Sequence, residues 1–242
     1  MSDQLHIVNS QIVISFKRNM LIRKRIFEFE DNLKSEFKIP FRAFTVPDDM
    51  DPNIPRFESE SIHGHSRLQV SQSRVTLATN YNDEFKLDYD QVEHYIDNKC
   101  KLLSDLVESE NVEFIAYIIE LGVFMNPESI NKFMKKHTGV IAISDDCIDF
   151  SLLYSMKHKE DYFINVKSSK FTQKELLLHQ ESKSLRPTGK EKFGISIVLD
   201  INTRPLFLKK MNFDNSLYES LKDEVFNVIK EKNVEQFLKG DL

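Results

Sequence analysis

The sequence predicts an α+β protein with two consecutive β-α-β(3-4)-α units, whose antiparallel sheets are each covered by two helices on one face. Alternating apolar residues mark several strands, and apolar residues three and four apart mark amphipathic helices. The order strand, helix, several strands and long helix occurs twice. We expect the first unit to span residues 1–110 and the second to span residues 111–242, packed as a single compact protein.

The first unit is predicted from patterns that change along residues 1–110. His6–Phe16 alternates in polarity as a half-buried strand does, and residues 21–37 carry the apolar stripe of an amphipathic helix. The segment VPDDMDPNIP contains three prolines and three aspartates, so we expect an exposed loop there. We expect further strands at residues 41–46, 56–62, 66–71 and 74–80, and a second helix over residues 88–108.

The second unit repeats this order. Val112–Phe124 is a strongly apolar strand, and Pro127 suits the first turn of a short helix that ends near His137. The segment KSLRPTGKEK, residues 183–192, is expected to be a loop. Further elements are expected as strands at residues 139–144, 149–157, 162–167 and 195–204, and as a last helix over residues 215–238. The two units could join edge to edge into one long saddle or close against each other.

The composition predicts a folded globular protein, because hydrophobic residues make up 40% and charged residues 29% of the chain. Phenylalanine is abundant, with 19 residues, and tryptophan is absent, so phenylalanine must form much of the aromatic core. The net charge of −5 argues against a dedicated nucleic-acid coat protein, which usually carries a basic surplus.

Three features of the sequence indicate the cellular compartment. No stretch approaches the roughly 18 apolar residues of a membrane-spanning helix, and MSDQLHIVNS lacks the pattern of a signal peptide. Cys100 and Cys147 lie far apart in apolar settings, at a spacing that makes neither a redox motif nor a metal knuckle. We therefore expect a cytoplasmic protein with free buried thiols and no contact with a membrane.

Two segments, Phe57–Phe85 and Gly194–Pro205, carry a distinctive strand pattern. The first has the form xLxVSxxxVxLxTxxY, and the second is a strand with a central acidic residue. The residues that fit are Leu68, Val70, Val75, Leu77, Tyr81 and Asp200. In these positions the chain resembles a sporadically distributed prokaryotic protein family of unknown function. The resemblance implies that these positions determine the fold, and the patchy distribution of the family implies defence, toxin–antitoxin or phage-derived functions.

One histidine pair, His63 and His65, has the character of a metal site. Two histidines one residue apart on a strand face the same side, and Glu58 or Glu60 on the preceding strand could supply a further ligand. Gly64 between the histidines favours an exposed turn instead.

Two groups of aspartates could also attract cations. A hard-cation loop needs carboxylates at regularly alternating positions and a glycine turn, but prolines take those places in VPDDMDPNIP, so we expect a solvated loop. Asp145, Asp146 and Asp149, near Cys147, could hold Mg²⁺, although Asp145 and Asp146 are more typical of a hairpin turn. We predict no cofactor.

Basic residues gather at two places that could contact phosphates. One group surrounds the start of the first helix, and the other lies in the expected 183–192 loop. The candidate nucleic-acid-binding residues are Arg18, Arg23, Lys24, Arg25, Lys183, Arg186, Lys190 and Lys192.

The sequence contains none of the motifs GxSxG and HExxH or the kinase motifs, and we predict no catalytic residues. We therefore expect a non-enzymatic binding or assembly protein that acts through a protein partner or self-association, in keeping with a mobile-element or defence system. Two alternatives stay open. One is a nucleic-acid-associated protein that uses the basic residues, and the other is a metal-dependent enzyme that uses His63, His65 or the aspartates.

Overall fold

A computed structural model describes residues 5–104, 106–107, 111–138, 149–179, 184–209 and 216–242. Its strands are β1 (His6–Phe16), β2 (Arg42–Ala43), β3 (Pro55–Glu60), β4 (Ser66–Ser71), β5 (Arg74–Asn80), β6 (Val112–Phe124), β7 (Ser151–His158), β8 (Tyr162–His179) and β9 (Ser184–Asn202). Its helices are the 3₁₀ helix η1 (Ile22–Arg25) and α1 (Ile26–Leu33), α2 (Tyr89–Ser104), α3 (Pro127–Thr138), α4 (Arg204–Leu208), α5 (Ser216–Glu231) and α6 (Val234–Lys239).

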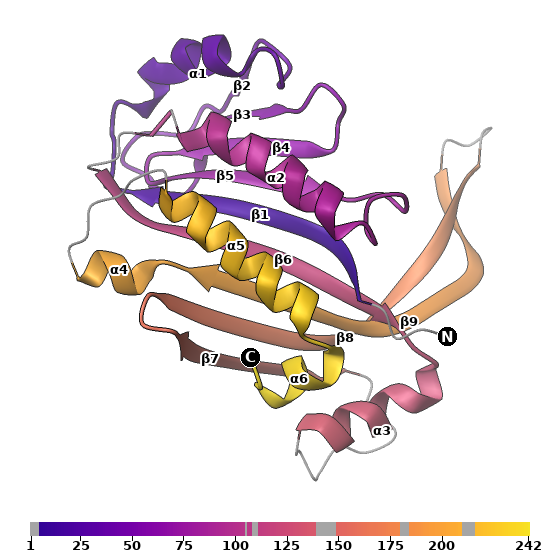
Figure 1. Cartoon of the computed structure of the whole chain (residues 1–242). Coiled ribbons are helices and arrows are strands. Elements are labelled where there is room, and N and C mark those ends of the chain that lie inside the picture. The colour runs from indigo at the N-terminus through magenta and orange to yellow at the C-terminus, as the bar shows by residue number, and fades with distance from the viewer. Residues whose placement is uncertain (1–4, 105, 108–110, 139–148, 180–183, 210–215) are drawn as a thin grey trace.

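The described strands form one continuous antiparallel sheet, in the order β2-β3-β4-β5-β1-β6-β9-β8-β7 (Figure 1). The prediction of separate sheets, each covered by two helices, is therefore wrong. The first strands of the two expected units, β1 and β6, pair with each other, for example Ile12 with Tyr117 and Ile14 with Ile115. Pairing satisfies backbone groups that two separate sheets would leave at exposed edges. Of the two arrangements left open, edge-to-edge joining is the one observed.

The two halves of the chain lie on opposite sides of the junction of β1 and β6. Outward from β1 the sheet continues through β5, β4, β3 and the short β2, and outward from β6 it continues through β9, β8 and β7. The junction therefore occupies the middle of the sheet, and side chains from both halves of the chain meet there.

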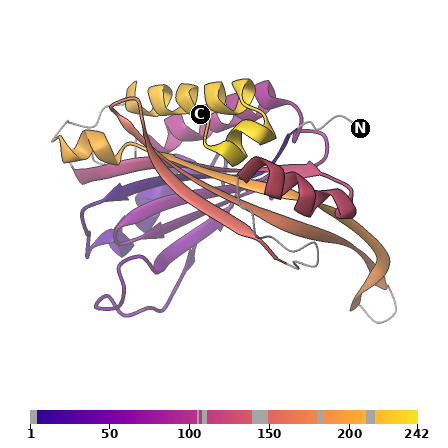
Figure 2. The ribbon, with the colours of Figure 1, turned by 90° about the horizontal axis from the view of Figure 1, so that it is seen from below.

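The main core lies between the sheet and helices α2 and α5, which run along one side of it (Figure 2). Ile12 and Tyr117 of the sheet, Ile96 of α2 and Val225 of α5 are all buried in this core. Phenylalanines contribute as expected. Phe29 of α1 and Phe57 of β3 meet edge to face, with ring centroids 5.3 Å apart.

Several expected elements differ from the observed ones. The strand expected at residues 41–46 is reduced to Arg42–Ala43, and the strand expected at residues 162–167 continues to His179. The helix expected over residues 21–37 divides into η1 and α1 and ends at Leu33. The loop expected at residues 183–192 is wrong for the described residues 184–192, because they belong to β9 and pair with β8 in a long hairpin. The helix expected over residues 215–238 is interrupted between α5 and α6. The strand expected at residues 139–144 lies outside the described residues.

None of the helices in the described ranges has the length and hydropathy that a membrane-spanning helix needs.

Candidate functional site

Side chains on the side of the sheet opposite α2 and α5 form a surface that we call the open face. No described helix lies over this side of β1, β6, β9 and β8 (Figure 2). Because side chains alternate between the two faces of a strand, every second residue of these four strands lies on the open face. They are Asn9, Gln11, Val13, Ala116, Ile118, Glu120, Val198, Asp200, Asn202, Phe163, Asn165 and Lys167.

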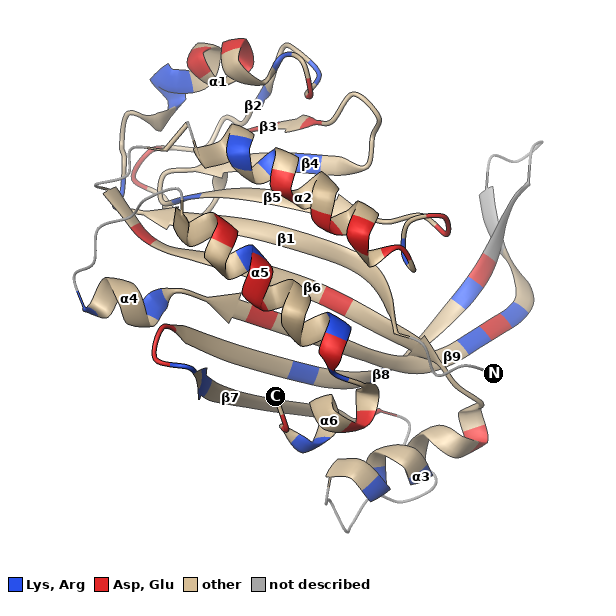
Figure 3. Cartoon of the chain, in the orientation of Figure 1, with Lys and Arg blue, Asp and Glu red and all other residues tan. Residues whose placement is uncertain are grey.

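Strand register sets these residues in rows across the junction. One row runs from Gln11 through Ile118 and Asp200 to Asn165. The next row runs from Asn9 through Glu120 and Val198 to Lys167. Figure 3 marks acidic residues of β6 and β9 in red near the middle of the sheet. Each row therefore carries one carboxylate near its centre with amides and apolar side chains beside it, and the second row ends in Lys167.

Asp200 is held by neutral donors. The side-chain amide of Asn165 donates to Oδ2 at 3.0 Å, and that of Asn202 donates to Oδ1 at 3.1 Å. Asn202 is only 1% exposed, so its amide is fixed in place. No basic nitrogen of a described residue lies within 4.0 Å of this carboxylate. Asp200 is thus oriented without an internal counter-charge.

Glu120 is held in the same way. Asn9 Nδ2 donates to Oε2 at 2.5 Å, and the hydroxyl of Ser196 donates to Oε1 at 2.7 Å. Among the described residues, no lysine, arginine or histidine forms an ion pair with Glu120 at the 4.0 Å limit. Because a carboxylate accepts about four hydrogen bonds, Glu120 keeps acceptor capacity for a further donor.

A pocket of about 380 Å³ adjoins Glu120 at the base of the β8–β9 hairpin. Its lining includes His6, Phe124 and Phe171. The imidazole of His6 stacks on Phe124, with ring centroids 4.9 Å apart, and Phe171 meets Phe124 edge-on at 5.7 Å. Ser196, which donates to Glu120, also lines the pocket. The pocket therefore combines aromatic walls with the carboxylate of Glu120.

The charges around this pocket have identifiable partners. Lys86 pairs with Asp83 at 2.5 Å, and both line the pocket. The ammonium groups of Lys86 and Lys192 lie 5.9 and 5.3 Å from the centroid of Phe124. Burial and the charge of Lys86 lower the pKa of His6, against an opposing effect of Asp83. The surroundings of His6 thus favour its neutral form.

The structure places His63 and His65 in the exposed turn between β3 and β4, where Gly64 has a φ of 74°. Glu58 pairs with Arg42 at 2.6 Å, and Glu60 pairs with Lys38 at 3.3 Å. The glutamates thus have basic partners on neighbouring segments. The described residues contain no group of three or more His, Cys, Asp or Glu side chains that could hold a metal ion.

The structure describes the first group of aspartates but only part of the second. Asp48 joins the VPDDMDPNIP loop to a group of arginines, with Arg23 at 3.0 Å and Arg56 at 3.7 Å. Arg56 is completely buried and donates to the carbonyl of Ile54 at 2.6 Å. The loop is therefore tied down by arginines. Asp145, Asp146 and Cys147 lie outside the described residues.

The basic residues of the first helix have structural partners. Arg18 donates to Gln72 at 3.0 Å and to the carbonyl of Asp48 at 2.7 Å. Arg25 donates to Glu28 at 2.6 Å and to the carbonyl of Leu106 at 2.9 Å. Together with the contacts of Arg23, these bonds fasten η1 to its surroundings. Lys24 is exposed.

The second basic group lies far from the first. Figure 1 shows η1 and α1 near one edge of the sheet and the β8–β9 hairpin projecting on another side. Lys190 lies 3.7 Å from Glu175 within the hairpin, and Lys192 lies over Phe124. Arg186 belongs to β9, and Lys183 is outside the described residues. The structure therefore does not bring the two groups into one patch.

Sequence reasoning missed His6, Glu120 and Gly122 as site residues. The available signal was the interruption of the apolar run Val112–Phe124 by Glu120 and Gly122, two residues apart and hence on the same face. Asp200 was singled out only for the fold.

A comparison with models of known protein families finds no match for this chain, and a comparison with curated proteins finds none either. The resemblance based on Phe57–Phe85 and Gly194–Pro205 therefore stays a prediction.

Proposed function

We propose that the protein is a non-enzymatic binding protein that takes a basic segment of a partner protein on the open face. The observation that carries this proposal is the pair of carboxylates, Glu120 and Asp200, that are oriented by neutral donors and have no described cation partner. Fixed acceptors of this kind favour ammonium or guanidinium groups, because hydrogen bonds between ions of opposite charge are stronger than neutral ones.

Apolar side chains between the carboxylates support a protein partner. Ile118 and Val198 lie beside Asp200 and Glu120 in the two rows, and Val13 and Phe163 lie in the neighbouring row. Leu153 of β7, at the end of the Glu120 row, is 70% exposed. Mixed apolar and polar surfaces of this kind are typical of protein interfaces, in which apolar contact adds affinity and charge adds specificity.

The same charges disfavour the nucleic-acid alternative. Phosphates would meet two carboxylates at the centre of the open face. Of the arginines expected to contact phosphates, Arg18, Arg23 and Arg25 are instead hydrogen-bonded to Gln72, the VPDDMDPNIP loop and Glu28. The buried free thiol of Cys100 suits a reducing compartment, so we place the binding function in the cytoplasm. The family resemblance would connect it with a defence or mobile-element system.

Fluorescence anisotropy with labelled peptides of equal length tests the proposal. Lysine/arginine-rich, aspartate/glutamate-rich and uncharged peptides are compared with single-stranded and duplex DNA at about 50 and 200 mM salt. We expect the basic peptides to bind, and we expect the variant Glu120→Gln/Asp200→Asn to lose about tenfold or more in affinity, or about 1.4 kcal/mol.

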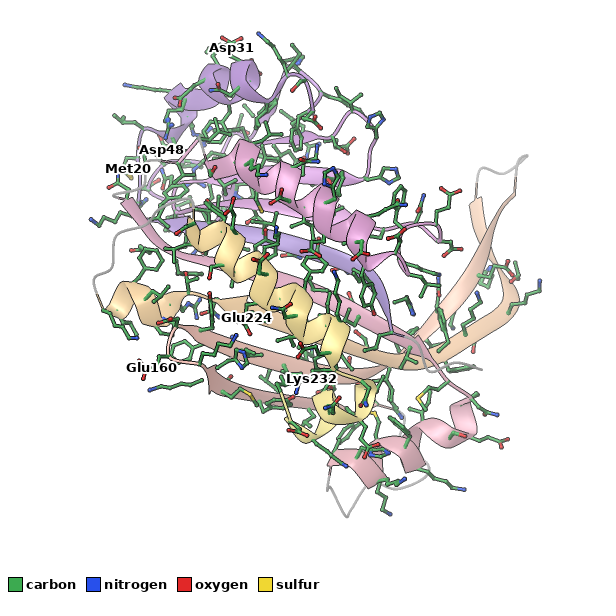
Figure 4. All side chains as sticks on the ribbon, viewed as in Figure 1. Met20, Asp31, Asp48, Glu160, Glu224 and Lys232 are labelled. Atoms are coloured by element: carbon green, nitrogen blue, oxygen red, sulfur yellow. The ribbon has the colours of Figure 1, made fainter. Side chains whose placement is uncertain are left out.

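The matched control is Asp31→Asn/Glu160→Gln, which changes the net charge equally. Figure 4 labels both residues, Asp31 on α1 and Glu160 in the turn between β7 and β8. Their side chains are 82% and 95% exposed. The control should bind like the wild type. Tighter binding of DNA than of basic peptides, or unchanged affinity in the Glu120/Asp200 variant, would overturn the proposal.

A further inference from the structure

We infer that the pocket beside Glu120 takes the guanidinium group of an arginine side chain in the bound segment. This inference rests on the proposed function and adds to it a specific residue type and a specific place. It is carried by the shape of the pocket, the hydrogen-bond acceptors that line it and its charge.

Two of the chain's six glycines shape the pocket. A Cβ atom at Gly122 would lie 2.7 Å from Nε2 of His6, and one at Gly194 would lie 2.6 Å from the ring of Phe171 and 2.2 Å from the carbonyl oxygen of Val123. Any larger residue would displace these groups. The glycines therefore let His6 and Phe171 lie directly against the sheet on either side of Phe124.

The pocket offers two acceptors that lack a full set of partners. Glu120 has one donor on each oxygen and lies at the pocket wall. His6 is 7% exposed, and no hydrogen bond from the described residues reaches its ring. A neutral imidazole carries one acceptor nitrogen. Glu120 and the acceptor nitrogen of His6 together suit a ligand with several N–H donors.

The unpaired carboxylate of Glu120 favours a cation. The charged residues that line the pocket are Asp83, Lys86 and Glu120, and the first two form an ion pair. Lys192 lies nearby over Phe124, but Glu120 has no cation partner within 4.0 Å among the described residues. Lys86 and Lys192 already hold ammonium groups near the face of Phe124, which shows that this aromatic surface attracts cations.

The geometry favours guanidinium over ammonium. Guanidinium is planar, has five N–H donors and stacks on aromatic rings, whereas ammonium is a compact and strongly hydrated point charge. A planar group can contact Phe171 with its face while its edge donates to Glu120 and His6. The volume of about 380 Å³ leaves room for the aliphatic part of the side chain.

The test compares basic peptides that are identical except at one position, which holds arginine, lysine or citrulline. Anisotropy titrations should show about tenfold tighter binding of the arginine peptide than of the other two. N-acetyl-arginine amide should compete with the arginine peptide, and N-acetyl-lysine amide should compete less.

Variants then test whether this pocket causes the preference for the arginine peptide. Gly122→Ala, which forces His6 to move, and His6→Phe, which keeps a ring and removes the acceptor, should both abolish the preference for arginine. Ser35→Ala is the control, because Ser35 is exposed beyond the end of α1 and outside the pocket. Circular dichroism melts show whether each variant is folded, and His6→Phe serves if Gly122→Ala does not fold.

Two failures can be told apart. If the peptides with arginine, lysine and citrulline bind equally while Glu120→Gln/Asp200→Asn still weakens them, the pocket inference is wrong and the proposed function stands. A preference for arginine that survives in His6→Phe also contradicts the inference. If no basic peptide binds the wild-type protein, both are wrong.

Discussion

Carboxylates of this protein have two kinds of partners. Glu120 and Asp200 accept hydrogen bonds from amides and a hydroxyl, whereas Glu224 of α5 pairs with His158 at 2.5 Å and with Lys159. Glu224 and these partners connect α5 with the end of β7, and Figure 4 labels Glu224 on α5. The nature of the partner therefore separates a carboxylate that stabilises the fold from one that is available for binding.

The ion pairs of Glu224 predict a pH-dependent stability. Burial opposes its ionisation, but hydrogen bonds from Lys159 and His158 outweigh this effect and lower the pKa of Glu224 below its ordinary value of 4.5. A lowered carboxyl pKa stabilises the folded state above the unfolded pKa, and the stabilisation is lost as the pH falls through the folded pKa. We expect Glu224→Gln to lower the free energy of unfolding by about 1.5–3 kcal/mol at pH 7.

Urea unfolding followed by circular dichroism measures this difference at pH 7 and at successively lower pH below 4.5, the ordinary value. The difference between wild type and variant should shrink in the acidic range. Glu160→Gln is the control, since Glu160 is 95% exposed and its loss should change stability by less than about 0.5 kcal/mol. An equal loss for Glu224→Gln at all pH values would contradict the ionic explanation.

For single residues, the sequence predicted which side chains are buried better than it predicted their hydrogen-bond partners. Cys100 was expected to be a free buried thiol, and the structure confirms this, with burial raising the pKa of the thiol to about 12. The roles of Arg18 and Glu120 could not be predicted, because Gln72 and Asn9 are their partners through the fold and lie far from them in the chain.

Secondary-structure elements were predicted well where one periodicity dominated. The bounds predicted for β1, β4, β5 and β6 agree with the structure. The segment KSLRPTGKEK was misinterpreted as a loop because it contains Pro187 and Gly189. Gly189 has a φ of 80° and lies where the register shifts between Lys174 and Leu176, as in a glycine-containing β-bulge. A bulge lets the hairpin continue past residues that usually end a strand.

The break between α5 and α6 shows how a local signal overrides a continuous apolar stripe. Asn233 accepts from the backbone N–H of Gln236 at 3.0 Å, and the Gln236 side chain accepts from the backbone N–H of Asn233 at 3.0 Å. This reciprocal capping box begins α6. The sequence contained the signal, but the apolar residues on both sides of Asn233 favoured a single helix.

The capping box predicts that Asn233→Ala lowers the free energy of unfolding by about 1 kcal/mol, because a backbone N–H loses its acceptor. Urea unfolding provides the measurement. A double-mutant cycle with Gln236→Ala should show that the two effects are less than additive, because both residues belong to one motif. Glu231→Ala, at the exposed end of α5, should have little effect. Additive losses would show that the two side chains act independently.

The architecture of the whole sheet depends on the pairing of β1 with β6. The sequence could not predict this pairing. Both arrangements left open bury the same apolar stripes, and the choice between them depends on pairing between strands about a hundred residues apart in the chain. The candidate site depends on the same junction, because Asn9 of the first expected unit donates to Glu120 of the second. Neither unit contains the complete site.

This junction predicts that residues 1–110 and 111–242 do not fold when they are expressed separately. Each fragment would expose one long edge of β1 or β6, together with apolar residues such as Ile12 or Tyr117 that are buried in the intact chain. We expect each fragment alone to aggregate or to lack a cooperative thermal transition in circular dichroism. Mixed during refolding, the two fragments should form a 1:1 complex in size-exclusion chromatography and recover binding of the basic peptide. If either fragment unfolded cooperatively as a monomer, the junction would be an interface between independent units, and the open face would be assembled by docking rather than by folding.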